Sequence, residues 1–482
     1  MSIRKRSAIA LLLALAALST LPALAAGATK ARKAGKRAAP PTAAAASVFP
    51  YPVEETTLDN GFRIVTIPYD SPGTIAYYTL VRTGSRDEVE KGHSGFAHFF
   101  EHMMFRGTAK YSQKQYADLV KRLGADSNAT TSDDWTRYYL VGPSSELETM
   151  MDMESDRFQN LKYDEQTFRT ESLAVYGEYN KSIASPFQPM IEKLRDLAYA
   201  RHPYKHLPIG FVDDIKAMPD SYQYSLQFFQ RFYRPENCIL IVVGDVDPQK
   251  VVALAKRYYG AWQRGYKAPD IEPEPPQSEA KTGHIDWPSP IHPQMVVGYH
   301  VPAFSVDSPD SAALELVGQL LFSDSAPLYQ DLVVNKQWVD FIGSDSGDHR
   351  DPYLFTITSR VHTEDQLAKV KEAVDQAIAG LQKGPIDPQR LARIKSHLRY
   401  EFALGLVSPR SVADAVTEAL YLTGRVDTIN RRFEQYQKLT AADVQRVAQQ
   451  VFRPQNETFV TVSHKAGPKT GTPGAAQGGS HE

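Results

Sequence analysis

The chain has 482 residues, of which 42% are hydrophobic and 23% charged, which is the composition of a globular protein with room for two or more domains. The formal net charge of −2 argues against general nucleic-acid binding. Cys238 is the only cysteine, so an intrachain disulfide and a cysteine-rich zinc finger are both excluded.

The first 25 residues have the pattern of an export signal. A basic segment, MSIRKR, precedes the apolar run AIALLLALAALSTLPALA, and Ala23-Leu24-Ala25 forms an A-x-A site. We expect cleavage after Ala25 and a periplasmic or secreted protein; the alternative is that the segment stays as a membrane anchor. No later stretch is long and apolar enough to span a bilayer. Residues 26–47 predict a disordered basic linker, and residues 466–482 a disordered tail.

Strands and helices alternate along the first predicted domain, residues 48–264. Amphipathic periodicity predicts helices, and β-branched alternation predicts strands. The predicted strands are 62–67 after a turn at 59–61, 75–85, a hairpin within 127–143, and 238–246, where Cys238 is expected to be buried. The predicted helices are 112–125, 144–160, 164–182 and 224–234, with a loop region between the last two.

A proline- and charge-rich segment, residues 265–290, predicts an interdomain linker before a second domain at 291–465. The second domain has predicted strands at 294–300 and around 338–360, and predicted helices at 308–322, 364–382, 387–406, 408–423 and 441–452. The segments FYRPEN and VFRPQN each end a helix and begin a strand. They lie a whole domain apart, which indicates two similar halves rather than a short repeat.

Residues 91–108, KGHSGFAHFFEHMMFRGT, contain the strongest chemical signal. On a helix, His98 and His102 lie on one face, one turn apart. Glu101 completes H-x-x-E-H, the inverted zinc-peptidase motif. Two imidazoles can share one zinc ion, and a neighbouring carboxylate can act as a general base. The alternative is a helix whose histidines hold no metal, but its apolar surroundings predict burial, and buried histidines need partners. His93 lies in the preceding loop and is expected to be a bystander.

A catalytic zinc site needs a third protein ligand. The predicted helix at 164–182 offers Glu165, Glu171 and Glu178. Glu171 and Glu178 are seven residues apart and share a helix face, so one could coordinate the ion while the other supports the site. The spacing alone does not choose between them, and a solvated acidic face is the alternative.

GFAHFFEHMMFRGT and TESLAVYGEYN together resemble the motif segments of the pitrilysin/insulinase family of zinc peptidases, which includes mitochondrial processing peptidase. The resemblance covers about residues 50–465. It implies that His98, His102 and Glu178 are the ligands of one zinc ion per chain. It also implies that Glu101 is the general base and Glu171 a supporting acid.

The same resemblance implies a fold and a substrate-binding element. SNATTSDDWTRYY resembles the family's substrate-binding edge strand, which places Asn128, Ala129 and Thr130 along a bound peptide held by backbone hydrogen bonds. The implied fold is α+β, with two homologous α/β-sandwich domains that close as a clamp around a peptide chamber.

One stretch, LYQDLVVNKQWVDF, departs from the family pattern. Active members have an arginine and, seven residues later, a tyrosine in the second domain, and the two residues help to bind substrate and stabilise the oxyanion. The matching positions are Val333 and Asp340, which cannot supply those donors. Tyr329 is close but out of register. Some members divide these parts between two subunits, so this chain resembles the zinc-bearing subunit of a heterodimer.

The sequence therefore predicts a zinc metalloendopeptidase subunit that hydrolyses unfolded or short peptides, with Glu101 activating the water. Its expected partner is a homologous chain that carries the arginine and tyrosine. A self-sufficient homodimer is an alternative. A non-catalytic subunit that contains zinc and binds peptides or supports assembly is another.

Overall fold

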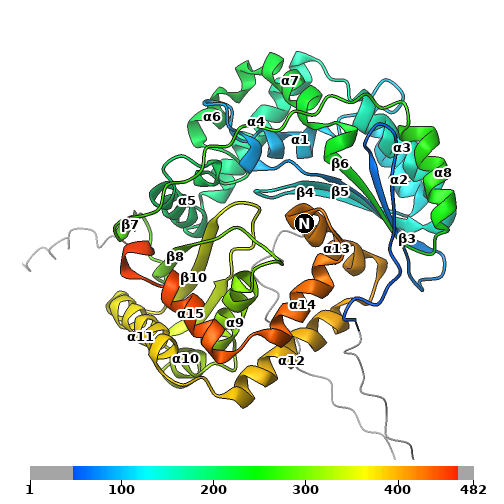
Figure 1. The fold of residues 1–482 in the computed structure, drawn as a ribbon. Helices are drawn as coiled ribbons and strands as arrows, with labels where there is room; N and C mark the ends of the chain where they lie inside the picture. Colours follow the sequence, from blue (N-terminus) through cyan, green and yellow to red (C-terminus); the bar gives the residue numbers. More distant parts are fainter. Residues whose placement is uncertain (1–46, 465–482) are drawn as a thin grey trace, which may run out of the picture. The chain divides into compact units, whose positions relative to one another are not determined.

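The computed structural model describes residues 47–464. The predicted signal peptide, nearly all of the basic linker and the C-terminal tail lie outside these residues. Residues 47–464 form one compact unit that contains two mixed sheets (Figure 1). Within residues 47–464, no helix combines the length and apolar character that a membrane crossing requires.

The first sheet and its helices come from the first half of the chain. The strands are β1 (Glu54–Thr57), β2 (Arg63–Pro68), β3 (Thr74–Val81), β4 (Asp126–Thr131), β5 (Thr136–Pro143) and β6 (Cys238–Gly244). The helices are α1 (Phe96–Met103), α2 (Gln113–Leu123), α3 (Leu147–Asn160), α4 (Glu165–Ser182), α5 (Phe187–Ala198), α6 (Val212–Ala217), α7 (Tyr222–Phe232) and α8 (Pro248–Tyr259). Cys238 is buried, as predicted.

The second half supplies the second sheet. Its strands are β7 (Lys281–Trp287), β8 (Gln294–Val301), β9 (Val339–Asp345), β10 (Tyr353–Val361) and β11 (Glu457–His464). The helices are α9 (Asp310–Phe322), α10 (Pro327–Tyr329) with a π-helical continuation (Gln330–Asn335), α11 (Glu364–Lys383), α12 (Pro388–Gly405), α13 (Pro409–Thr423), α14 (Thr428–Lys438) and α15 (Ala441–Val451).

The two sheets repeat one topology. The first has the order β1-β2-β6-β3-β5-β4, and the second β7-β11-β8-β10-β9. Leaving out β1, each sheet starts with a parallel pair, β2–β6 or β7–β11, and continues with antiparallel neighbours. The prediction of an α+β fold with two similar halves is therefore confirmed.

The repeated arginine–proline segments also fold alike. Pro235–Asn237 and Pro454–Asn456 are each a 3₁₀ turn between a helix and an inner strand of its sheet. The side chain of Asn237 donates to the Phe232 carbonyl at 2.9 Å, and that of Asn456 to the Val451 carbonyl at 2.8 Å. Each buried asparagine thus satisfies the carbonyl five residues earlier, where its helix ends.

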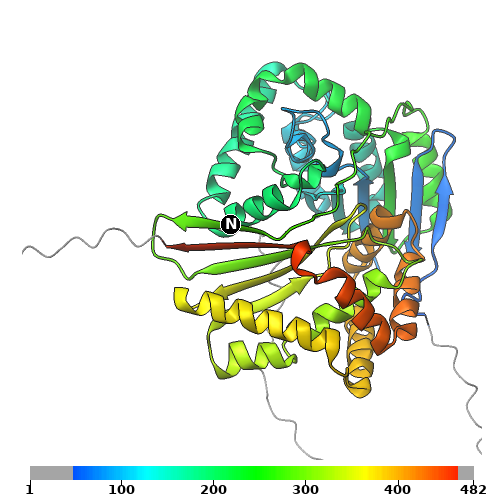
Figure 2. The ribbon, with the colours of Figure 1, turned by 60° about the vertical axis from the view of Figure 1, so that its left-hand side comes forward.

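Each half covers the other half's sheet with one helix. Helix α5 packs on β7, β8 and β11, and α13 packs on β3 and β6. Figure 2 shows the second sheet from the side, with α11 in yellow on one face. Strand alternation explains this layering: Val296 packs in the cluster that contains α5, and Val297 in the cluster on the opposite face, which includes α9.

Two sequence predictions about connections are wrong in part. The predicted loop region after α4 contains helices α5 and α6. Pro186 and Pro189 do not break α5, because they fall at its start, where proline is tolerated. The predicted linker 265–290 does connect the sheets, but its Lys281–Trp287 part is the edge strand β7. Strand β7 pairs with β11, far away in sequence, so no local signal marked it.

Candidate active site

The motif helix α1 begins at a backbone position that requires glycine. Gly95 is the N-cap residue with φ 91°, and a Cβ there would lie 2.5 Å from the Ile209 carbonyl oxygen. Glycine has no side chain to cap the helix. The buried carboxylate of Glu88 does so instead, accepting the N–H groups of Gly95 at 2.7 Å and Ala97 at 2.6 Å. Glu88 therefore fixes the start of the motif helix.

Aromatic packing fixes the rest of α1, as its apolar sequence predicted. Phe99, Phe100 and Met103 are fully buried. The Phe100 ring stacks on Phe228 of α7, with centroids 5.3 Å apart and planes 8° apart. The helix is therefore held on its apolar sides, and its histidine face is left toward α4, which lies beside it (Figure 1).

His98, His102 and Glu178 converge between α1 and α4. One donor atom from each lies within 4.8 Å of the others. Glu178 Oε2 lies 3.9 Å from His98 Nε2 and 3.4 Å from His102 Nε2. Two ligands about 2.05 Å from one tetrahedral zinc ion are about 3.4 Å apart. Two imidazole nitrogens and one carboxylate oxygen at these separations fit zinc in both chemistry and spacing.

Glu171 lies on the other side of His102. Its Oε2 is 3.7 Å from His102 Nδ1, and its Oε1 is 2.5 Å from Arg106 Nη2. Burial raises the pKa of Glu171, but His102 and Arg106 outweigh burial, so the net pKa is lowered. An ionised Glu171 is suited to accept from His102 Nδ1 and so to hold the ring with Nε2 toward Glu178.

Glu101 lies on the motif helix α1, and His93 lies in the loop before it. Glu101 lies on α1 directly before His102 and is half-buried. His93 lies before the helix, where its ring packs 3.9 Å from that of Tyr224, and it is not part of the metal-binding group.

The predicted peptide-binding segment is β4, which ends the first sheet and contacts α1. Asn128, Ala129 and Thr130 lie in its centre and pair with Tyr139, Tyr138 and Arg137 of β5, respectively. Among residues 47–464, strand β4 has no other neighbour in its sheet, so one edge is open for an added strand.

The register shows which residues of β4 face that edge. Ser132 N–H donates to the Trp135 carbonyl at 2.8 Å, which makes this a hydrogen-bonded pair. Such pairs alternate along an antiparallel ladder. The backbone groups of Ala129 and Thr131 therefore point away from β5, while those of Thr130 point toward it.

The positions expected to carry arginine and tyrosine have other roles here. Val333 packs against a hydrophobic core cluster to which both halves contribute. Asp340 begins β9 together with Val339, and its carboxylate accepts from Arg360 at 2.5 Å and from His362 at 2.9 Å. Neither residue offers a hydrogen-bond donor, in agreement with the sequence.

Two supporting residues were not predicted. Glu88 is seven and nine residues from the N–H groups it accepts, so no capping pattern marks it. Arg106 follows the motif in MMFRGT, and only the fold shows that it meets Glu171 on α4.

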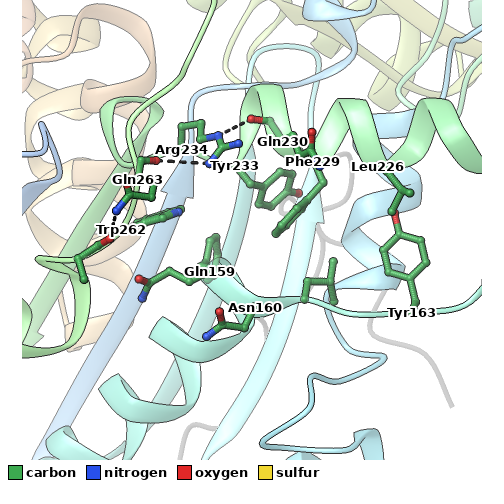
Figure 3. Close-up of a pocket in the computed structure, with 13 residues that line it drawn as sticks. Gln159, Asn160, Tyr163, Leu226, Phe229, Gln230, Tyr233, Arg234, Trp262 and Gln263 are labelled. Atoms are coloured by element: carbon green, nitrogen blue, oxygen red, sulfur yellow. Dashed lines mark hydrogen bonds between the residues drawn. The ribbon is translucent and has the colours of Figure 1, made fainter.

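A cavity of about 370 Å³ has a lining that includes none of the candidate metal ligands; Figure 3 shows the residues around it. It is formed by the end of α3, helix α7 and the segment after α8. Phe229 and Tyr233 line it and also pack on Phe100, with ring centroids 5.7 and 5.4 Å away. The aromatic wall of this cavity thus supports the motif helix.

The repeated α+β fold, with an H-x-x-E-H helix facing a glutamate of a second helix, is typical of zinc peptidases with the inverted motif. Residues 65–208 match the family model of insulinase, peptidase family M16, and residues 221–398 match the model described as the peptidase M16 inactive domain. The chain belongs to peptidase family M16.

Relatives of similar length support this assignment. The zinc protease PqqE of Helicobacter pylori is 28% identical over 421 residues, which are 84% of this chain and 92% of that protein. A probable mitochondrial-processing peptidase subunit beta of Schizosaccharomyces pombe is 25% identical over 429 residues, which are 83% and 88% of the two chains. The crystal structure of a protease from Helicobacter pylori superposes with a TM-score of 0.81 and 28% identity, covering 86% of this chain and 99% of that chain.

Proposed function

We propose that this chain is a zinc metalloendopeptidase subunit that hydrolyses extended peptides. The observation that carries the proposal is the convergence of His98, His102 and Glu178 at zinc-ligand spacing, with Glu101 beside them on the helix. A site that bound zinc only for structure would have no need of Glu101. The relatives named zinc proteases support the same chemistry.

Each side chain has a distinct role in this proposal. His98, His102 and Glu178 hold the ion, which supplies Lewis-acid chemistry: it lowers the pKa of a water and polarises a carbonyl. Glu101 takes a proton from the attacking water and returns it to the leaving amine. Glu171 holds His102 in the orientation that binding requires.

The substrate is an extended peptide that adds a strand to the open edge of β4. The backbone groups of Ala129 and Thr131 pair with it, because they point outward. Asn128 and Thr130 flank the peptide with their side chains. Backbone pairing is largely independent of side chains, so unfolded or short peptides are the expected substrates.

The test compares the zinc-loaded protein with its Glu101→Gln variant on a quenched fluorescent peptide library. Glutamine keeps the shape of glutamate but cannot accept the proton. We expect chelator-sensitive cleavage by the wild type, if needed with its partner, and unchanged zinc content without cleavage in the variant. Cleavage by Glu101→Gln at the wild-type rate would refute Glu101 as the base.

Val333 and Asp340 also favour the need for a partner, since neither can supply an oxyanion donor. We propose a homologous subunit that carries the arginine and tyrosine, as in a two-subunit processing peptidase; the relative named subunit beta agrees with this. The same observation favours a second candidate, a non-catalytic zinc-containing subunit that binds peptides or supports assembly. Activity that appears only on adding the homologous subunit supports the heterodimer, and its absence with every partner supports the second candidate.

The proposed site of action is the periplasm or the extracellular space. The N-terminal export pattern supports it, and cleavage after Ala25 is part of the proposal. N-terminal sequencing of the protein purified from its cells tests the cleavage position.

A further inference from the structure

The turn that joins β4 to β5, residues 132–135, is enclosed by polar contacts from both halves of the chain. Asp133 is 5% exposed, and its carboxylate accepts two hydrogen bonds from Arg195 of α5, at 2.7 and 2.9 Å. Arg195 is itself 8% exposed. A buried carboxylate held by a bidentate arginine has little freedom to move, because separating the two charges would leave both unpaired.

The second half completes this enclosure from the loop between β9 and β10 and from Tyr353, the first residue of β10. Tyr353 donates to Asp133 at 3.3 Å and also contacts Arg195, and His349 Nε2 lies 3.4 Å from the Asp133 carboxylate. The backbone N–H of Arg350 donates to Asp134 at 3.0 Å. In the second sheet, β9 and β10 take the places that β4 and β5 take in the first sheet. The β9–β10 connection and the β4–β5 turn are therefore equivalent segments of the two halves, and they meet here.

The same loop is fastened to the first half beside the motif helix. Asp351 accepts from Arg86 at 2.5 Å and lies 3.0 Å from His202 Nε2. The backbone N–H of Arg86 in turn donates to the Asp133 carbonyl at 2.8 Å. Gly84 allows this approach, because a Cβ there would lie 2.3 Å from the Ser132 carbonyl oxygen. The turn is therefore clasped between a segment of the first half and a loop of the second.

We infer that the second half positions β4 for substrate, and that Tyr353 and Asp351 are positioning residues of the proposed peptidase. Strand β4 pairs with β5 along its six residues and contacts α1, and the clasped turn adds a further anchor at the C-terminal end of the strand. A strand whose end is fixed presents its outward backbone groups at a constant register, which lowers the entropy cost of pairing with a peptide. This inference rests on the proposed function.

The decisive variant is Tyr353→Phe, which removes the hydroxyl that contacts Asp133 and Arg195 in the clasp around residues 132–135. The matched control is Tyr299→Phe, which removes a buried hydroxyl that donates to Glu457 at 2.6 Å, elsewhere in the second half. Both proteins are tested zinc-loaded, and with the partner subunit if turnover needs it. The substrates are a peptide long enough to pair along β4 and a short peptide that spans only the cleaved bond.

For Tyr353→Phe we expect KM for the long peptide to rise about tenfold with kcat nearly unchanged, and little change for the short peptide. Zinc affinity should be unchanged. An equal loss for both peptides, or no more change than in Tyr299→Phe, would overturn the inference. Asp351→Asn, whose side chain is 26% exposed, should reproduce the effect if Tyr353→Phe folds poorly.

Hydrogen exchange without substrate separates this inference from the proposed function. Backbone N–H groups within residues 126–135 should exchange faster in Tyr353→Phe than in the wild type, but not in Tyr299→Phe. If the wild type cleaves no peptide, with or without a partner, the proposed function fails while this result still decides whether the second half fixes β4. Unchanged exchange in Tyr353→Phe would overturn the inference whatever the activity.

Discussion

Glu171→Gln tests whether Glu171 supports the metal site or belongs to it. Glu171 is 3% exposed, its Oε2 is 3.7 Å from His102 Nδ1, and its Oε1 is 2.5 Å from Arg106. Glutamine keeps the volume but loses the charge that orients His102. The three proposed ligands stay in place, so zinc should bind with its usual ligands but more weakly.

The expected loss can be estimated from these contacts. Removing a group that orients a ligating histidine typically weakens metal binding about 10- to 100-fold, which is about 1.4–2.7 kcal/mol. The ion pair between Arg106 and Glu171 forms without zinc, so we expect its loss to lower the melting temperature rather than the zinc affinity. Glu178→Gln removes a ligand and should therefore cost more zinc affinity than Glu171→Gln.

The assay is competition for zinc with a chromogenic chelator at constant pH, with thermal unfolding as a check on the fold. The control is Glu165→Gln, which alters another glutamate of α4 whose side chain is 56% exposed and paired with Arg169. Zinc binding by Glu171→Gln as tight as that of Glu165→Gln would refute the supporting role. A loss equal to that of Glu178→Gln would make Glu171 a ligand.

Three further changes probe the start of α1, the open edge and the clasp. Gly92 and Gly95 both have positive φ, so alanine at either position should lower the free energy of unfolding by about 1–2 kcal/mol. Gly95→Ala should cost more than Gly92→Ala in urea unfolding, because only Gly95 is crowded by neighbouring atoms. Ala129→Pro should raise KM with little change in melting temperature, because the lost N–H points outward. Burial raises the pKa of Asp351, but the His202 and Arg86 side chains lower it more, so the net pKa is below its usual value. The ionised Asp351 carboxylate therefore stabilises the fold above about pH 4, and this contribution is lost as pH falls through the folded-state pKa of Asp351. The melting temperature of Asp351→Asn should fall below that of the wild type at neutral pH and approach it in acid.

The sequence predicted most elements whose signals are local, although the amphipathic helices α8 and α14 were missed. Helix α1, helix α4 and the β4–β5 hairpin each carry their own periodicity, and all three form where expected. The echo of FYRPEN in VFRPQN correctly indicated a repeated fold, because both segments perform the same turn from helix to strand. Helix α5 and strand β7 were missed, and both pack on elements far away in sequence.

The candidate site was predictable to a similar limit. Two histidines one helical turn apart indicate a metal site. Spacing alone does not decide whether Glu165, Glu171 or Glu178 is the third ligand. Only the packing of α4 on α1 brings Glu178 to both histidines and leaves Glu171 behind His102. Glu88 caps α1 from an earlier loop, and that role depends entirely on tertiary structure.

The second half of the chain repeats the fold of the first half but has a different role. At the two positions where the family resemblance leads us to expect oxyanion donors, it has an apolar side chain, Val333, and a carboxylate, Asp340, that accepts from Arg360 and His362. Asp340→Tyr would therefore leave Arg360 and His362 without their shared acceptor rather than simply restore a donor. What the second half does offer is a fixed loop against the β4–β5 turn. A chain that orders the substrate strand internally and takes its missing donors from a partner would need both halves, even though only one carries the metal ligands.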